Sequence, residues 1–343
     1  MNIVINNKEV EVREGETLIE VAERAGYPIP HLCYSKGAQH KSSCMVCAVK
    51  DCATDQIIPS CSTLPTEGMK IDTESPDIKL ARTLSLELLL SDHRADCEAP
   101  CSLVCPEGLD IEKMLEYYDA EKLSEAYNEI SKTFQLPQIA CETCKAPCEK
   151  ACRRGTIDKA VAIRSIITEV VGKSRKAEGA GVIRENHSSG EEYDMSGTAS
   201  SGAGEQPAKQ DKNIFLSRLG RFSEEEKGLL KSTVITPSRC LHCACAGQEG
   251  CKLRLYATSE SIKRSRYETS SAMSAMTRQH VSGNIWFEPA KCISCGLCVY
   301  NSKNGFTFKD RGFVMQVMLP EENAENISEQ LTKLCPTGAL YTK

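Results

Sequence analysis

The sequence is poor in aromatic residues and contains no long apolar run. Phe, Trp and Tyr together make up 5% of its 343 residues. The longest apolar segment, Leu84–Leu90, is interrupted by Glu87 and is far shorter than the roughly 18 residues that a membrane helix needs. No membrane span is therefore expected. Several small lobes held together by metal ligation would explain the shortage of aromatic residues, because inorganic clusters can replace part of a hydrophobic core.

Other features that are missing exclude further classes of function. The formal net charge is −5, and the lack of a basic surface argues against nucleic acid as the main partner. No G-x-G-x-x-G turn follows a strand pattern, so no flavin or NAD(P)H site is expected on this chain. No nucleophile–base set is recognisable, so no catalytic residue is assigned. Met1–Val12 alternates like a strand and lacks the apolar core of a secretory signal.

Cysteine, in contrast, is abundant and clustered. Nineteen of the 20 cysteines fall into tight groups, and only Cys52 is left over, which we expect to be a small buried thiol. Disulfides at this density belong to short secreted chains. Metal ligation in a reducing, cytoplasmic setting is therefore predicted, with iron–sulfur favoured over zinc because of the spacings. The groups are Cys33/Cys44/Cys47/Cys61, Cys97/Cys101/Cys105, Cys141/Cys144/Cys148/Cys152, Cys240/Cys243/Cys245/Cys251 and Cys292/Cys295/Cys298 with Cys335.

The first group follows a recognisable pattern of local structure. Alternating apolar residues on either side of Asn6-Asn7 predict a hairpin. Thr17 and Glu20 form a capping-box pattern before a short helix that Gly26 ends. Together with the four cysteines, residues 1–75 resemble the β-grasp [2Fe–2S] domain that begins the large peripheral subunit of respiratory complex I and many iron-only hydrogenases. The resemblance implies that Cys33, Cys44, Cys47 and Cys61 are ligands. A zinc ribbon would need two paired knuckles, which are absent.

A helix with its apolar face at Ile78, Ala81, Leu84 and Leu88 is predicted next, ending near His93. The sequence from Leu88 through His93-x3-Cys97 resembles the same family, in which this histidine ligates a [4Fe–4S] cluster. The alternative is a surface histidine at a helix C-terminus, where an imidazolium suits the dipole. After Cys97 the spacing leaves that family's pattern.

Residues 90–172 resemble a second family, the double-cluster domain of the glutamate synthase small subunit and dihydropyrimidine dehydrogenase. The specific part is Cys144-x-x-Pro-Cys148-Glu-x-x-Cys152. The resemblance implies two [4Fe–4S] clusters with interleaved ligands. Cys97 and Cys101 would pair with Cys152, and Cys105 with Cys144 and Cys148. His93 and the extra thiol Cys141 complete eight candidate ligands. One cluster plus a zinc ion, or a site completed by water, Gln or backbone, remain alternatives.

Two groups remain near the C-terminus. The run Cys240/Cys243/Cys245/Cys251 has no standard ferredoxin spacing and suits either a [4Fe–4S] cluster or a tetrahedral zinc ion. Cys292/Cys295/Cys298 with Cys335-Pro336 resembles a bacterial ferredoxin motif, which implies one [4Fe–4S] cluster. Between its two parts, residues 305–309 and 312–319 read as two strands.

These patterns predict an α+β chain of three lobes. We expect a β-grasp [2Fe–2S] domain at 1–75, a helical double-[4Fe–4S] domain at 76–172, a flexible linker at 173–212 and a ferredoxin-like lobe at 213–343. One [2Fe–2S] and three to four [4Fe–4S] clusters, or one zinc at 240–251, would be bound. The expected function is an electron-transfer subunit between a flavin or NAD(P)H partner subunit and a ferredoxin- or hydrogenase-type partner. The alternative is a zinc-rich interaction scaffold.

Overall fold

The structure is a computed structural model that describes residues 1–93, 96–179, 224–245, 250–262, 278–312, 315–320 and 327–342. No helix within these ranges is long and apolar enough to cross a membrane. The chain divides into two compact units. The first unit comprises Met1–Ala99, Asn213–Leu229 and Cys243–Lys343, and the second comprises Pro100–Lys212 and Leu230–His242. The two units are described in turn.

The first unit begins with a five-stranded mixed sheet of order β2-β1-β5-β3-β4. The predicted hairpin is confirmed: Asn6 and Asn7, with φ of 48° and 68°, form the left-handed turn between β1 and β2. β1 then pairs in parallel with β5, while β3 pairs antiparallel with β4 and β5. The strands are β1 (Asn2–Ile5), β2 (Lys8–Glu11), β3 (Ala48–Asp51), β4 (Gln56–Pro59) and β5 (Lys70–Asp72).

Helix α1 (Leu18–Arg24) packs on this sheet, and its ends match the sequence pattern. The capping box is present, with Thr17 N–H donating to Glu20 at 2.9 Å. Gly26, at φ 88°, ends the helical turn. Ile3, Ile5 and Leu18 are almost fully buried between helix and sheet. The N-terminal lobe therefore has a small but closed apolar core.

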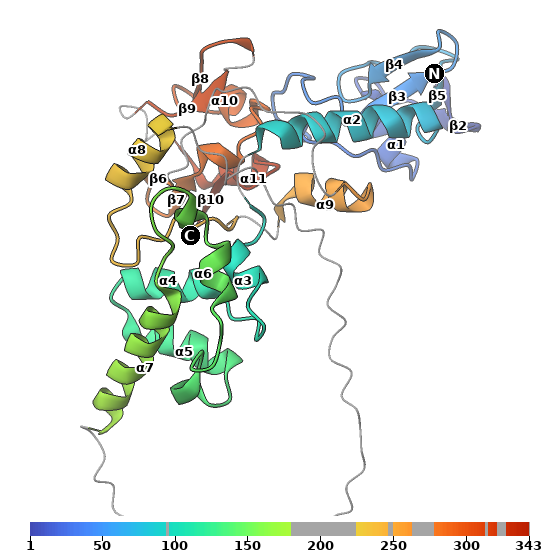
Figure 1. Cartoon of the computed structure of the whole chain (residues 1–343). Helices are drawn as coiled ribbons and strands as arrows, with labels where there is room; N and C mark the ends of the chain where they lie inside the picture. Colours follow the sequence, from blue (N-terminus) through green and yellow to red (C-terminus); the bar gives the residue numbers. More distant parts are fainter. Residues whose placement is uncertain are drawn as a thin grey trace, which may run out of the picture. The chain divides into compact units, whose positions relative to one another are not determined.

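Helix α2 (Pro76–Asp92) follows β5 and runs along the sheet (Figure 1). Its predicted apolar face is only partly right, because Ile78 is buried but Leu88 is exposed. The buried positions Ile78, Leu86 and Leu90 recur every four or eight residues and lead to His93, which is 6% exposed. The cause is tertiary packing: this face contacts β3 and the later helix α9 (Lys252–Ser259). His93 therefore lies on the same buried side as Leu86 and Leu90.

The rest of the first unit is the C-terminal lobe, built on the sheet β10-β7-β6. The two strands expected between the parts of the ferredoxin-like motif are confirmed as the antiparallel pair β8 and β9. Val281, Phe287, Phe306 and Leu340 fill the core. The elements are β6 (Gln279–Ser282), β7 (Ile285–Phe287), α10 (Leu297–Asn301), β8 (Thr307–Lys309), β9 (Gln316–Met318), α11 (Glu329–Leu334) and β10 (Leu340–Thr342).

The second unit is helical. Its first long helix, α4, ends at Asp119, and the next helix, α5, packs against it. Helix α7 packs on α5 and continues to Gly179, so the start of the expected linker is helical. Residues 180–212 lie outside the described residues. The helices are α3 (Pro100–Leu103), α4 (Ile111–Asp119), α5 (Leu123–Thr133), α6 (Pro147–Ala151) and α7 (Ile163–Gly179), with α8 (Glu224–Thr233) crossing the division between the units.

A buried charge cluster stabilises the C-terminal lobe. Lys291, only 1% exposed, forms an ion pair with Glu288, and Arg278 lies 3.2 Å from the same carboxylate. Both cations also donate to the carbonyl of Ala244, at 2.9 and 3.4 Å. Removing one member of such a group is strongly destabilising, because it leaves another charge buried without its partner.

Glu288→Gln should therefore lower the free energy of unfolding by about 3 kcal/mol or more, since it removes the negative charge that faces the buried Lys291 and the partly buried Arg278. Urea unfolding under anaerobic conditions, followed by circular dichroism, measures the shift. Asp55→Asn is the matched control in the same unit, because Asp55 pairs with Lys50 at 2.7 Å but is 84% exposed. Its change should stay within about 0.5 kcal/mol. Equal shifts for the two variants would contradict the assignment of a stabilising buried cluster.

Candidate functional site

The N-terminal thiol set (Cys33, Cys44, Cys47 and Cys61) lies at one end of the β3–β4 hairpin. The register of the hairpin, Ala48 opposite Pro59, brings Cys47 close to Cys61 across the two strands. Ser60 fixes this end by donating to the Cys47 carbonyl at 2.7 Å. Met45 adopts a left-handed φ of 54°, which turns the chain sharply between Cys44 and Cys47. All four thiols are buried.

The thiols of this set interact with one another. Hydrogen bonds from Cys44 and Cys61 hold the pKa of Cys33 well below its usual range, while donating raises the pKa of Cys44 and of Cys61. A hydrogen bond from Cys61 lowers the pKa of Cys47 to about 7. The Ser42 hydroxyl lies 3.3 Å from the Cys61 sulfur. The four thiols thus lie within hydrogen-bond reach of one another. A metal that replaces their protons would find four thiolate ligands close together.

Cys52 takes no part in this arrangement. The prediction that it is buried is wrong, because it is exposed. It follows β3 at the tip of the β3–β4 hairpin, away from the end that carries the thiols. Its position agrees with its exclusion from every candidate ligand group.

The C-terminal thiol set (Cys292, Cys295, Cys298 and Cys335) is built from a tight loop, α10 and the end of α11. Backbone N–H groups point at two of its sulfurs: Ser294 N–H donates to Cys292 at 3.3 Å, and Leu340 N–H donates to Cys335 at 3.4 Å. Burial raises the pKa of Cys292 to about 12, with the charge of Cys335 adding to the effect. Burial disfavours the negatively charged thiolate, and the backbone N–H donors favour it. The site can therefore hold thiolate sulfur in apolar surroundings.

Gly296 is required by the loop of the C-terminal thiol set. Its φ is 81°, and a Cβ built there would lie 2.5 Å from the ring of Tyr300. Only glycine fits a left-handed position with so close a neighbour.

Two more groups of thiols lie in the second unit. The Cys105 set consists of Cys105, Cys141, Cys144 and Cys148. Burial raises the pKa of Cys141 to about 11, and the neighbouring charges of Cys144 and Cys105 contribute. Burial likewise raises the pKa of Cys148 to about 11, and Cys141 and Cys105 are again among the neighbours that raise it. Ala146, at φ 51°, turns the chain into α6, which carries Cys148. Cys141, the extra thiol of the sequence pattern, is therefore near the three others.

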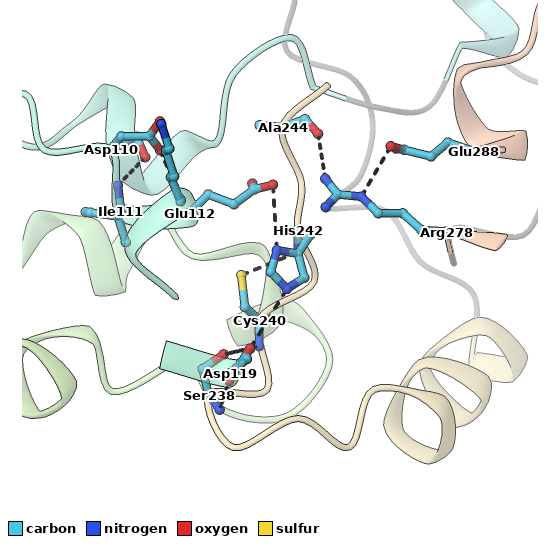
Figure 2. A network of polar contacts seen from close by, with 12 residues as sticks. Asp110, Ile111, Glu112, Asp119, Ser238, Cys240, His242, Ala244, Arg278 and Glu288 are labelled. Carbon is cyan, nitrogen blue, oxygen red and sulfur yellow. Dashed lines mark hydrogen bonds and ion pairs between the residues drawn. The ribbon is translucent and has the colours of Figure 1, made fainter. Parts of the chain in front are cut away.

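The Cys101 set consists of Cys101, Cys152 and Cys240. Burial raises the pKa of Cys101 to about 12, followed by the charges of Glu112 and Cys152. Burial also raises the pKa of Cys240, and Glu112, Cys101 and Cys152 add to it. Figure 2 shows the surroundings of Cys240: the His242 ring lies between Glu112, at 3.8 Å, and Asp119, at 3.9 Å. Cys240 is thus held against α4.

The run Cys240/Cys243/Cys245/Cys251, which the sequence presents as one candidate site, has members in both units. Cys240 belongs to the second unit, whereas Cys245 and Cys251 belong to the first. Cys245 and Cys97 are near enough to Cys251 for their charges to raise its pKa, after burial, to about 12. Cys97 also lies in the first unit, whereas Cys101 lies in the second. The Cys97 carbonyl accepts a hydrogen bond from Cys245 N–H at 3.4 Å. The Cys251 set is defined as Cys97, Cys245 and Cys251.

The donor chemistry of these sets fits iron–sulfur clusters. Buried thiols with backbone N–H groups aimed at sulfur are the environment in which such clusters are held and tuned. Among the described residues, no three His, Cys, Asp or Glu side chains are already arranged around a point for a single metal ion. A cluster has its own irons and sulfides between the ligands, so its thiolates lie further apart than the ligands of one ion.

Comparison with known protein families agrees with this chemistry. Residues 1–76 match the 2Fe-2S iron-sulfur cluster binding domain, and residues 285–342 match the 4Fe-4S single cluster domain. Residues 91–178 match the dihydropyrimidine dehydrogenase domain II, 4Fe-4S cluster. The chain contains three iron–sulfur cluster-binding domains. The α+β fold class and the predicted resemblances are confirmed.

The chain is also similar to parts of larger redox proteins. It is 28% identical over 176 residues to an NADH-quinone oxidoreductase subunit of Rhizobium meliloti, covering 46% of this chain and 20% of that protein. It is 32% identical over 166 residues to the NADP-reducing hydrogenase subunit HndD of Solidesulfovibrio fructosivorans, covering 44% of this chain and 27% of that protein. The chain thus spans about a quarter or less of these relatives.

A solved structure, that of the NAD+-reducing [NiFe]-hydrogenase in the H2-reduced state, aligns with 100% of this chain and 87% of its own. The TM-score is 0.49 and the sequence identity 14%.

Cys44→Ser should abolish the visible and EPR signals of a [2Fe–2S] cluster, because Cys44 is buried in the N-terminal thiol set. Cys52→Ser is the matched control: it removes an exposed thiol eight residues away in the same lobe and should leave the spectrum and about two irons per domain unchanged. An unchanged spectrum in Cys44→Ser, or loss of the signal in Cys52→Ser, would contradict the ligand assignment.

Gly296→Ala should reduce cluster loading by about four irons per chain, since the new methyl group meets Tyr300 in the loop of the C-terminal thiol set. Gly312→Ala is the control, because Gly312 also has a positive φ, 62°, but open space around its Cβ position. Iron analysis of both variants separates a steric effect on the site from general backbone strain. Equal iron loss in the two variants would rule out the steric explanation.

Proposed function

We propose that the chain is an electron-transfer subunit of a multi-subunit oxidoreductase. It would relay single electrons between a flavin- or NAD(P)H-binding partner and a ferredoxin- or hydrogenase-type partner. Iron–sulfur clusters accept and release electrons one at a time, and their potentials depend on cluster type, hydrogen bonds to sulfur and burial.

One observation carries this proposal: thiols from three groups line one apolar core. Cys33 and Cys44 of the N-terminal thiol set, Cys97, and Leu253 of α9 are all buried in it. Cys251 and Cys295 pack against the same core. The charge of Cys33 also contributes, after burial, to raising the pKa of Cys295. Cofactors held by these thiols would be close neighbours, as a relay requires, and the aliphatic side chains between them exclude water.

The partner follows from what the sequence does not contain. A hydride pair has to be separated into single electrons, and a flavin does this chemistry. No nucleotide-binding turn is recognisable in this sequence, so a separate flavoprotein is the expected donor or acceptor. The relatives named above are subunits of NADH-quinone oxidoreductase and of an NADP-reducing hydrogenase. The division at residues 75, 172 and 212 and a reducing, cytoplasmic setting belong to the same proposal.

Chain purified without oxygen should contain about 18 irons, with matching sulfide, for one [2Fe–2S] and four [4Fe–4S] clusters. A reductive titration should take up about one electron per cluster. NADH alone should not reduce the chain, whereas NADH with a catalytic amount of an NADH-oxidising flavoprotein should.

Other metal contents have distinct meanings. About 14 irons and one zinc would indicate that one four-ligand site holds a structural zinc ion instead of a [4Fe–4S] cluster. Zinc with little sulfide would replace the electron-transfer proposal by the interaction scaffold. Fast reduction by NADH in the absence of a flavoprotein would contradict the need for a partner.

A further inference from the structure

We propose that the run from Cys240 to Cys251 is divided between two clusters. Cys245 and Cys251 join Cys97 and His93 in one site, which has three thiolates and an imidazole as ligands. Cys240 belongs with Cys101 and Cys152 in another. This assignment rests on the proposed function, since it concerns which residues hold the clusters of the relay.

The first argument is the backbone contact between two segments that are far apart in sequence. Asp96 and Ala244 form a parallel β-bridge, and Cys245 N–H donates to the carbonyl of Cys97 at 3.4 Å. In a parallel pair, residues in register project to the same side. The register therefore places Cys97 beside Cys245.

Cys251 is held near Cys97 by a second set of contacts. It is the N-cap residue of α9, where its sulfur accepts a hydrogen bond from Arg254 N–H at 3.4 Å. The Arg254 guanidinium lies 2.9 Å from Glu98, the residue after Cys97. Cys97 and Cys251 also share one apolar core. The start of α9 and the Cys97 segment are thus held together by an ion pair and by packing.

His93 supplies the fourth ligand in this arrangement. The buried stripe of α2, through Leu86 and Leu90, ends at His93, and both leucines are in the core that contains Cys97. Helix α2 packs on α9, which begins at Cys251. An imidazole four residues before Cys97, on the buried end of this helix, suits a metal ligand.

The carbonyl of Ala244 is the point at which the run is fixed to the C-terminal lobe. It accepts hydrogen bonds from Lys291 at 2.9 Å and Arg278 at 3.4 Å, as Figure 2 shows for Arg278. One buried and one partly buried cation on the same carbonyl restrain the residue immediately before Cys245. This anchoring keeps Cys245 at the bridge with the Cys97 segment.

Cys240 is anchored elsewhere, on α4. Ser238 donates to Asp119 through its N–H at 2.7 Å and its hydroxyl at 2.6 Å. His242 N–H donates to the Cys240 sulfur at 3.4 Å, and His242 has a left-handed φ of 50°. Helix α3, which carries Cys101, packs on α4 and on α6, and Cys152 caps α6.

The turn at Cys240 repeats the turn at Cys292. There too the residue two positions on, Ser294, has a left-handed φ, 51°, and its N–H donates to the sulfur at 3.3 Å. Residues 285–342 match a 4Fe-4S domain, so this turn is one that a cluster-binding loop uses. Cys243, the second cysteine of Cys240-x2-Cys243, belongs to the first unit and is not included in the Cys101 set.

Iron counts in double variants test the division, since the wild-type total of about 18 irons is the same for either arrangement. Cys97→Ala and Cys251→Ala should each lose about four irons, and the double variant should lose no more than either alone. Cys240→Ala combined with Cys251→Ala should lose about eight irons. The opposite pattern, about four for Cys240/Cys251 and about eight for Cys97/Cys251, would overturn the proposal. The EPR signal of the [2Fe–2S] cluster in each variant serves as the folding control.

A second measurement does not depend on losing a ligand. With 15N-labelled histidine, pulsed EPR of the reduced wild type should show nitrogen coupled to a cluster. His93→Cys should abolish this coupling while the iron content stays near the wild-type value, because cysteine supplies a thiolate in place of the imidazole. Absence of the coupling in wild type, or its persistence in His93→Cys, would overturn the assignment of His93.

The failure of this inference can be told from the failure of the proposed function. A wild-type chain with full iron and sulfide but the opposite pattern of double-variant losses overturns the division alone. A wild-type chain with zinc and little sulfide overturns both.

Discussion

The constraint on which the rest of the structure depends is that thiols must be held close together where water does not reach. Burial, with neighbouring charges adding to it, raises the pKa of Cys101, Cys251 and Cys292 to about 12, so these thiols would stay protonated at neutral pH without a metal. Metal binding displaces those protons, and its free energy becomes part of the free energy of folding. This explains how a chain with 5% aromatic residues can fold. Cysteines are members of the apolar cores that pack on the N-terminal sheet and on α9.

Backbone N–H groups contribute to holding the thiols in place. N–H groups directed at the sulfurs of Cys240, Cys251, Cys292 and Cys335 occur in both units and at loops of unrelated sequence. Hydrogen bonds to sulfur favour the charged form and influence cluster potentials. Left-handed residues between closely spaced cysteines recur as well, and sharp turns at these positions bring cysteines that are two or three residues apart to one side of the loop.

Local patterns could be predicted from the sequence, and long-range ones could not. The Asn6-Asn7 hairpin, the Thr17 cap and the strand pair within the ferredoxin-like lobe depend on a few neighbouring residues, and all are present. The sequence pattern misplaces the apolar face of α2 because tertiary packing against β3 and α9 decides which leucines are buried. Spacing groups Cys240 with Cys251 because they are close in sequence, whereas the β-bridge between Asp96 and Ala244 is a contact that spacing cannot reveal.

That bridge also joins two segments of the first unit between which the chain passes through the second. The chain leaves the first unit after Ala99, returns to it for Asn213–Leu229 and returns again from Cys243 onward. Asp96 and Ala244, near the first departure and the last return, are paired. Insertions are tolerated where the two ends already meet, because the parent fold then has little loop closure left to lose. The carbonyl of Ala244, which accepts hydrogen bonds from Lys291 and Arg278, fixes the returning segment within the first unit, in addition to the backbone pairing with Asp96. One short run can then supply thiols to both units without a further loop, since the change from one unit to the other takes place between His242 and Cys243.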